Sequence, residues 1–234
     1  MPDKKKIKSM FDGISADYDR LNHLLSLGTD RYWRRRALRE ILDPARPQRI
    51  LDVACGTGDF SIAIARKMHP DSHVTGLDLS PGMLAVMERK LEKAGLQNRI
   101  DTREGDCEQL PWPEASFDRV TIAFGIRNFE NRARALHEIL RVLKPGGRLV
   151  ILELSVPSHP LLRGPYMLYF RHILPWIGGL VSGDRKAYEY LPASVLSFPD
   201  PQEWTEFMQE YGYVKVSHRA FSLGICRMYT GSKS

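Results

Sequence analysis

The sequence predicts a single α/β domain built on an open, mostly parallel β-sheet. Between residues 46 and 156, short apolar runs typical of buried strands alternate with amphipathic helices. A Gly-x-Gly turn, Gly56-Thr57-Gly58, separates the first of these strands from the first helix. The chain has 234 residues, enough for one such domain with a hydrophobic core. Alternating strands and helices imply right-handed crossovers, which place ligands at the carboxyl ends of the strands.

The predicted single domain has four parts along the chain. They are an N-terminal helical cap (1–45), the alternating core (46–156), an apolar insert (157–200), and a C-terminal helix with a pair of strands (201–234). In the cap we expect helices over 12–23 and 30–42. The second is predicted because apolar residues from Trp33 to Ile41 recur at helical spacing, and Pro44 ends it.

The core is predicted from apolar runs and the turns that stop them. Strands are expected over 50–54, 73–79, 99–104, 118–124 and 148–154, with helices from Phe60 and over 81–94 and 133–142. Gly95 stops the helix 81–94, and Lys144-Pro145-Gly146-Gly147 is predicted as a tight turn before the last of these strands.

After residue 156 the alternation stops. Residues 159–181 are rich in Leu, Tyr, Phe, Ile and Trp but are interrupted by Pro165, Pro175 and Gly178-Gly179. The last part predicts a helix over 201–211 and two strands over 213–220 and 222–230.

Composition narrows the class of protein. The three cysteines form no C-x-x-C pair, which favours a reducing cytosol and argues against a disulfide or metal framework. No apolar run approaches the about 18 residues that a membrane span needs, and the lysine-rich start does not resemble a secretory signal. The net charge of +6 leaves two interpretations of the basic clusters at 4–8 and 31–39: solvated surface, or attraction to an anionic partner.

The Gly-x-Gly turn predicts a nucleotide-like cofactor. A strand, a glycine turn and a helix N-terminus together bring bare backbone N–H groups up to a ligand. A dinucleotide is one candidate, because Asp78 lies twenty residues beyond Gly58, where a carboxylate can bind ribose hydroxyls. The dinucleotide fingerprint requires a third glycine, however, and Ser61 stands there. S-adenosylmethionine (SAM) is the other candidate.

Four landmarks in order favour SAM. Asp52-x-Ala54-x-Gly56-x-Gly58 resembles the first motif of class I SAM-dependent methyltransferases, although that family usually has glycine at the position of Ala54. Asp78, Gly105-Asp106-Cys107 and the turn 144–147 resemble three later landmarks of the same family. The resemblance implies a Rossmann-like three-layer sandwich with a mostly parallel seven-stranded sheet and an antiparallel C-terminal strand. The cofactor residues that it implies are Asp52, Gly56, Thr57, Gly58, Asp78, Leu79, Asp106, Cys107 and Ala123.

The flanking segments are similar to one branch of that family, the ubiquinone/menaquinone biosynthesis C-methyltransferases (UbiE/MenG type). The similarity lies in residues 11–34, 124–128, 141–153 and 174–194, so it spans nearly the whole chain. Some members carry a serine near the cofactor where Ala123 stands, so the resemblance leaves open a hydrogen bond to the cofactor at this position but not the activity. Asp52 has two interpretations: it binds the methionyl amino group of SAM, or it only holds the turn.

The resemblance implies methylation of a ring carbon of a prenylated quinol, either demethylmenaquinol or its ubiquinone-pathway counterpart. Arg127, Asn128 and Tyr18 are the expected catalytic residues. Because a guanidinium stays protonated, Arg127 is predicted to stabilise a phenolate or orient water; the alternative is a loop salt bridge. Residues 159–181 are either a lid or channel for the prenyl tail or a flap over the sheet edge.

The expected partners are the quinol and, peripherally, an anionic membrane surface at the inner face of the membrane, without a metal or nucleic acid. A homodimer is left open. Rival functions are a methyltransferase of RNA or of another small molecule, and a non-catalytic SAM-binding partner in a biosynthetic complex.

Overall fold

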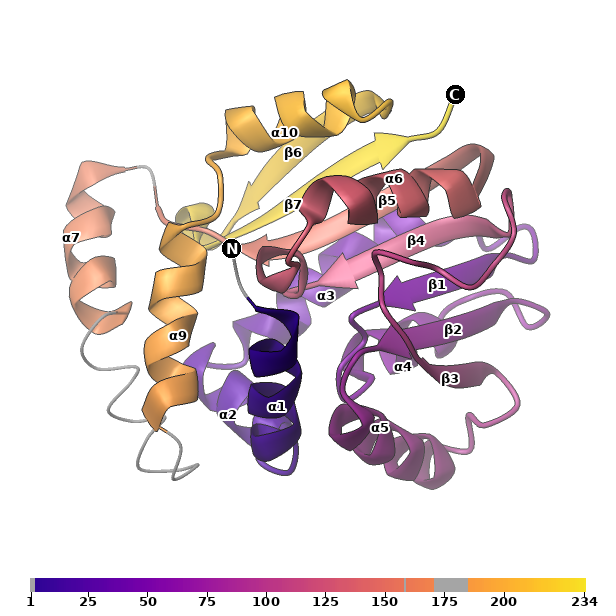
Figure 1. Cartoon of the computed structure of the whole chain (residues 1–234), viewed down its shortest axis with the longest axis horizontal. Coiled ribbons are helices and arrows are strands. Elements are labelled where there is room, and N and C mark those ends of the chain that lie inside the picture. The colour runs from indigo at the N-terminus through magenta and orange to yellow at the C-terminus, as the bar shows by residue number, and fades with distance from the viewer. Residues whose placement is uncertain (1–2, 158, 171–184) are drawn as a thin grey trace.

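A seven-stranded sheet forms the centre of the chain (Figure 1). The computed structural model describes residues 3–157, 159–170 and 185–234. Its strands are β1 (Arg49–Val53), β2 (His73–Asp78), β3 (Ile100–Glu104), β4 (Phe117–Ala123), β5 (Leu143–Leu154), β6 (Val214–Phe221) and β7 (Cys226–Ser232). They are ordered β3-β2-β1-β4-β5-β7-β6. The strands β1 to β5 pair in parallel, and β7 pairs antiparallel with both β5 and β6, which confirms the predicted fold class.

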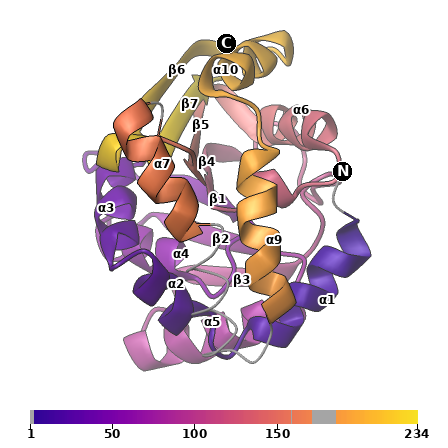
Figure 2. The same cartoon turned by 90° about the vertical axis from the view of Figure 1, so that its left-hand side faces the viewer.

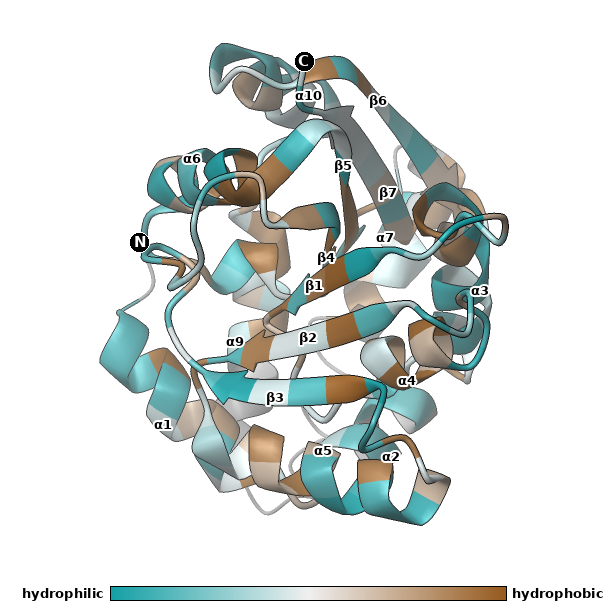
Figure 3. Cartoon of the chain, turned by 90° about the vertical axis from the view of Figure 1, so that its right-hand side faces the viewer, coloured by the Kyte–Doolittle hydropathy of each residue, from teal (hydrophilic) through white to brown (hydrophobic). Residues whose placement is uncertain are grey.

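Helices cover both faces of the sheet, so the molecule has three layers. On one face α3 (Thr29–Ile41), α4 (Asp59–Ala65) and α5 (Pro81–Ala94) pack in one apolar cluster with sheet residues such as Ile50 and Val150. On the other face α6 (Arg132–Val142) and α10 (Pro201–Glu210) pack with Leu51 and Leu149, the residues next to Ile50 and Val150 in their strands. Figure 3 shows the resulting brown apolar segments within the strands and the teal outer surfaces of the helices. Adjacent residues of the central strands β1 and β5 therefore pack in opposite cores.

Four further helices gather at the carboxyl ends of the parallel strands (Figures 1 and 2). They are α1 (Lys4–Ile14), α2 (Tyr18–Leu25), α7 (Pro160–Leu168) and α9 (Arg185–Leu196). A short 3-10 helix, η1 (Ile126–Asn128), follows β4 at the same end. Ligand sites of parallel α/β sheets form at this edge. None of the described helices combines the length and hydropathy needed to cross a bilayer.

Capping residues explain why the core helices begin and end where the sequence predicts. Ser80 accepts a hydrogen bond from the backbone N–H of Met83 at the start of α5, and Pro81 occupies the first turn. Gly95 closes the same helix with a φ of +64°.

Four predictions differ from the structure. The helix expected over 12–23 is two helices, α1 and α2, with a break at 15–17. The turn 144–147 lies within β5 as a bulge opposite the single residue Asp118. The last strand begins only at Cys226, because a second 3-10 helix, η3 (Ser222–Gly224), precedes it. Helix α9 was not expected; of the apolar stretch 159–181, residues 171–181 lie outside the described part of the chain.

Candidate active site

The glycine turn connects β1 to α4 in a left-handed conformation. Gly56 and Gly58 have φ values of +55° and +82°, a region that side chains disfavour. A Cβ atom on Gly58 would lie 2.5 Å from Cγ of Met87 on α5. Glycine is therefore required at position 58 for packing against α5. Gly58 does not line either of the cavities beside the turn that are described below.

Ala54 also has a positive φ, +53°, where the resembling family usually has glycine. Its methyl group occupies the space beside Gly125, because a Cβ atom on Gly125 would lie 2.7 Å from Cβ of Ala54. The methyl group of Ala54 therefore leaves no room for a side chain at Gly125, which follows β4.

Asp52 and Asp78 stand at the carboxyl ends of β1 and β2. Both oxygens of Asp52 accept hydrogen bonds, from Ser61 Oγ at 2.5 Å and Thr121 Oγ1 at 2.7 Å. Burial raises the pKa of Asp52 to about 6, although these two hydroxyls lower it. Asp78 accepts from the backbone N–H of Gly56 at 2.7 Å and of Ser80 at 2.9 Å, and burial likewise raises its pKa. Asp78 therefore holds the glycine turn, whereas Asp52 ties β1 to α4 and β4.

One cavity lies between the turn, β2, β3 and α1, with about 760 Å³ of empty space. Of the predicted cofactor residues it is lined by Gly56, Asp78, Leu79, Asp106, Cys107 and Ala123. A smaller cavity of about 330 Å³ adjoins it and is lined by Asp52 and Thr57. We call these the cofactor cavity and the small cavity. Together they collect every predicted cofactor residue except Gly58.

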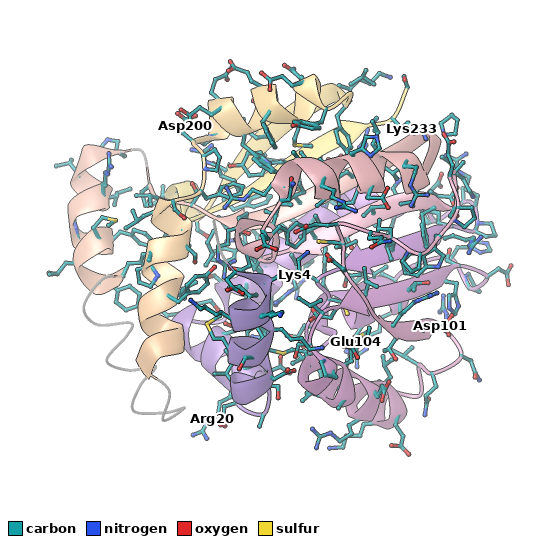
Figure 4. All side chains as sticks on the ribbon, viewed as in Figure 1. Lys4, Arg20, Asp101, Glu104, Asp200 and Lys233 are labelled. Atoms are coloured by element: carbon teal, nitrogen blue, oxygen red, sulfur yellow. The ribbon has the colours of Figure 1, made fainter. Side chains whose placement is uncertain are left out.

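Helix α1 forms a wall of the cofactor cavity. Lys4 Nζ donates to Asp106 Oδ2 at 2.6 Å and to Glu108 Oε2 at 3.0 Å, and Lys8 Nζ donates to Glu104 Oε1 at 2.6 Å. Figure 4 shows Lys4 on α1 and Glu104 at the end of β3 on neighbouring elements. Sequence reasoning treated these lysines only as a basic cluster and missed their intramolecular contacts.

A third cavity of about 680 Å³, the acceptor cavity, meets the cofactor cavity at Tyr18 and Phe124. Polar groups in its lining include Asn22, Arg34 and Arg127. Its apolar lining includes Tyr166, Phe170, Leu191 and Ile225, from α7, the residues after it, α9 and the β6–β7 connection. An aromatic molecule with polar ring substituents and an apolar tail matches this distribution.

Arg127 and Asn128, adjacent in η1, face different cavities. Arg127 lines the acceptor cavity, where its Nη1 donates to Glu153 Oε1 at 2.7 Å and its Nε to Ser194 Oγ at 3.3 Å. Asn128 lines the cofactor cavity, and its Oδ1 accepts from Tyr190 Oη at 3.0 Å. Arg127 thus forms the salt bridge that the alternative interpretation expected. It also lines the acceptor cavity, so the salt bridge does not prevent a contact with the acceptor.

Tyr18 lines all three cavities. Burial raises the pKa of its hydroxyl, while the positive charges of Arg127 and Arg34 lower it. The phenol is therefore protonated at neutral pH and acts as a hydrogen-bond donor.

Phe124 was not predicted as a site residue. It separates the cofactor and acceptor cavities with a φ of +63°, which is strained for a bulky side chain. Its N–H donates to Leu152 O at 2.7 Å, and its carbonyl accepts from Arg127. These two hydrogen bonds hold the strained conformation. Glu153 was not predicted as a site residue either, although an acid inside an otherwise apolar strand is a sequence signal for a buried functional or ion-paired group.

Three potential metal ligands, His23, Asp30 and Asp59, have donor atoms within 4.8 Å of one another. Cationic side chains already pair with both acids, since Arg34 contacts Asp30 and Lys90 Nζ lies 2.5 Å from Asp59 Oδ1. We therefore assign no metal to this cluster.

Comparisons with known proteins agree with this geometry. A model of the ubiE/COQ5 methyltransferase family matches residues 1–233. The chain belongs to the ubiE/COQ5 methyltransferase family. It is 48% identical over 227 residues to the ubiquinone/menaquinone biosynthesis C-methyltransferase UbiE of Syntrophotalea carbinolica, covering 97% of this chain and 94% of the relative. It is 42% identical over 229 residues to a demethylmenaquinone methyltransferase of Bacteroides fragilis, covering 98% and 93%.

Solved structures with a similar fold share much less sequence. The 4+2 cyclase SpnF has a TM-score of 0.68 at 19% identity, with 99% of this chain and 96% of that chain covered. The SAM complex of a phosphoethanolamine N-methyltransferase from Haemonchus contortus has a TM-score of 0.64 at 16% identity, covering 86% and 52%. These likenesses show the fold alone. Family membership makes this ubiE/COQ5 member a SAM-dependent methyltransferase, and the cofactor and small cavities are lined by the acids Asp52, Asp78 and Asp106 that were predicted to bind SAM.

Proposed function

We propose that the chain methylates a ring carbon of a prenylated quinol. The acceptor is demethylmenaquinol or the 2-polyprenyl-6-methoxy-benzoquinol of ubiquinone synthesis. The acceptor cavity carries the proposal, because it combines polar groups around Arg127 with an apolar wall from α7 and α9 and meets the cofactor cavity at Tyr18. The names of the relatives, which include demethylmenaquinone methyltransferase, point to the same chemistry.

SAM supplies an activated methyl group, so the protein has to orient the acceptor and raise the nucleophilicity of its ring carbon. Transfer of the quinol hydroxyl proton to water would raise electron density on the adjacent ring carbon, and after methylation that carbon would lose its own proton to water, which restores the aromatic ring. Arg127 stabilises the phenolate and Tyr18 donates a hydrogen bond, while Asn128, fixed by Tyr190, orients groups on the cofactor side. Glu153 neutralises much of the charge of Arg127, so its contribution is that of a fixed dipole in a buried site.

The apolar wall of the cavity also supports a peripheral location at the inner face of the membrane. Leu161 and Leu168 on α7 are 80% and 62% exposed. The basic residues that remain exposed, Lys5, Lys6 and Arg31 among them, complement anionic lipids. We expect sedimentation with vesicles containing phosphatidylglycerol, weaker sedimentation after Leu161→Ser with Leu168→Ser, and none with neutral vesicles. Equal sedimentation of both proteins would contradict this role of α7.

The acceptor is tested by supplying radiolabelled SAM with reduced demethylmenaquinone, the benzoquinol analogue and RNA in parallel. Label in one or both quinols supports the proposal; label only in RNA, or in none of them, contradicts it. Arg127→Gln combined with Glu153→Gln removes both charges of the buried ion pair and so leaves neither one unpaired. We expect this pair to slow turnover while the affinity for SAM changes less than about threefold, whereas Asp78→Asn should mainly weaken SAM binding.

A further inference from the structure

The small cavity has a charge pattern of its own. It opens beyond the glycine turn, between α3 and the start of α4. Its lining carries two acids, Asp52 and Asp59, and one cationic side chain among the described residues, that of Arg34. Asp59 is already paired with Lys90 at 2.5 Å. Asp52 pairs with no cation among the described residues, whereas Arg34 pairs with Asp30 through Nη1 and keeps its other N–H groups for a ligand, so the lining suits the ammonium and carboxylate of a zwitterion.

Arg34 comes from the N-terminal cap. Its Nη1 contacts Asp30, four residues earlier on α3, and lies 3.7 Å from Asp59 Oδ2. Its guanidinium carbon lies 5.4 Å from the ring centroid of Phe124. These contacts hold the guanidinium at the junction of the small and acceptor cavities, both of which it lines.

The Nε–H group of Arg34 is buried and has no hydrogen-bond partner in the described part of the chain. A buried donor without a partner carries a desolvation penalty, which a ligand can remove by accepting its hydrogen bond. A guanidinium offers parallel N–H groups that match the two oxygens of a carboxylate. The missing partner is therefore expected to be a carboxylate.

We propose that Arg34 binds the α-carboxylate of the methionyl group of SAM. The cap helix α3 then completes the cofactor site, and Arg34 places the same guanidinium beside the acceptor cavity. The proposal rests on the cofactor of the family and does not depend on which acceptor is methylated. Its failure would leave the quinol assignment untouched, since the test below contains no acceptor.

Two ligands separate the role of the carboxylate from the rest of the cofactor. S-adenosylhomocysteine keeps the amino-acid group, whereas methylthioadenosine lacks it and keeps the adenosine and the sulfur. Dissociation constants are measured by calorimetry for both ligands with the wild type, Arg34→Gln, and the matched control Arg35→Gln. Arg35 is the exposed neighbour on the same helix.

We expect Arg34→Gln to weaken S-adenosylhomocysteine binding by about 10- to 100-fold, the range of one charge-assisted hydrogen-bond pair. Methylthioadenosine binding should change less than about threefold, and Arg35→Gln should affect neither ligand. Equal weakening of both ligands, or no weakening of either, would overturn the proposal. Because Arg34→Gln leaves Asp30 buried without its cation, Asp30→Asn with Arg34→Gln is measured alongside it, and decides the question if the single variant does not fold.

Discussion

Three carboxylates, those of the buried Asp52 and Glu153 and of the half-buried Asp78, stand at the carboxyl ends of β1, β5 and β2. Each accepts hydrogen bonds from the residues that shape the site: the hydroxyls beside the turn, the N–H of Gly56, and the guanidinium of Arg127. Burying charge in this way costs stability, and the cost is usually tolerated where a ligand needs the charge.

The pKa of Asp52 leads to a stability prediction. Because burial raises it from 3.8 to about 6, ionised Asp52 destabilises the folded state, and this cost appears as pH rises from about 4 to 6. Asp52→Asn should therefore increase the free energy of unfolding, relative to wild type, by up to about 3 kcal/mol above pH 6 and by little at pH 4. The Asp52→Asn substitution should also weaken SAM binding.

Urea unfolding at several pH values measures this difference, with the exposed Asp71→Asn as the control. A difference between Asp52→Asn and wild type that does not change with pH would show that Asp52 is not the titrating group.

The contact between Gly125 and Ala54 allows a second test with single-residue substitutions. Gly125→Ala would bring two methyl carbons to 2.7 Å, so we expect a loss of about 1–3 kcal/mol in stability. Ala54→Gly removes the only close contact, since the next atom, Ile122 Cγ2, lies at 3.5 Å. Thermal unfolding of the single and double variants should therefore show rescue in the double variant. Additive losses would mean that the crowding lies elsewhere.

The sequence predicted the site residues whose types are tied to a motif, such as Asp52, Asp78 and Arg127. It did not predict Phe124 or Arg34, because their roles depend on a strained backbone and on the packing of α3 beside the turn. Such contacts between distant segments leave no spacing pattern in the chain.

Among the elements, the N-terminal helices show how tertiary contacts override local patterns. The helix expected over 12–23 breaks because both parts are tied to the core. Asp12 Oδ1 accepts from Ser80 Oγ at 2.5 Å and from the N–H of Gly82 at 3.0 Å, and Asp19 accepts from Thr57 on the turn. Core helices, whose caps are local, were predicted within a residue or two.

The contacts of α1 predict that it limits exchange of the cofactor. Lys4→Gln removes the ion pairs with Asp106 and Glu108 that hold α1 over the cofactor cavity. Because such half-exposed pairs contribute up to about 1 kcal/mol, S-adenosylhomocysteine should dissociate about two- to fivefold faster, and wild-type release should accelerate with salt. Stopped-flow fluorescence measures both. An unchanged rate in Lys4→Gln, or an equal effect of the exposed Lys5→Gln, would contradict this role.

In the whole molecule, the cofactor, small and acceptor cavities meet at Tyr18, at the carboxyl edge of the sheet. The fold class and the cofactor followed from the sequence because the strand–turn–helix landmarks are local and ordered. The acceptor cavity followed only in part: Tyr18, Arg127 and the apolar stretch 159–181 were expected beside the acceptor, and Tyr18, Arg127 and Tyr166 line the cavity. The contributions of α3 and α9 were not expected, because only the fold brings these helices to the cavity.

The central claim is that this junction directs the methyl group to a ring carbon. Its most direct test is the product formed from SAM carrying a 13C-labelled methyl group and reduced demethylmenaquinone, examined by carbon NMR. We predict a single new methyl signal of an aryl C–CH3 group, and no product with the oxidised quinone. A methoxy signal, or no transfer to the quinol while another acceptor is labelled, would contradict the account.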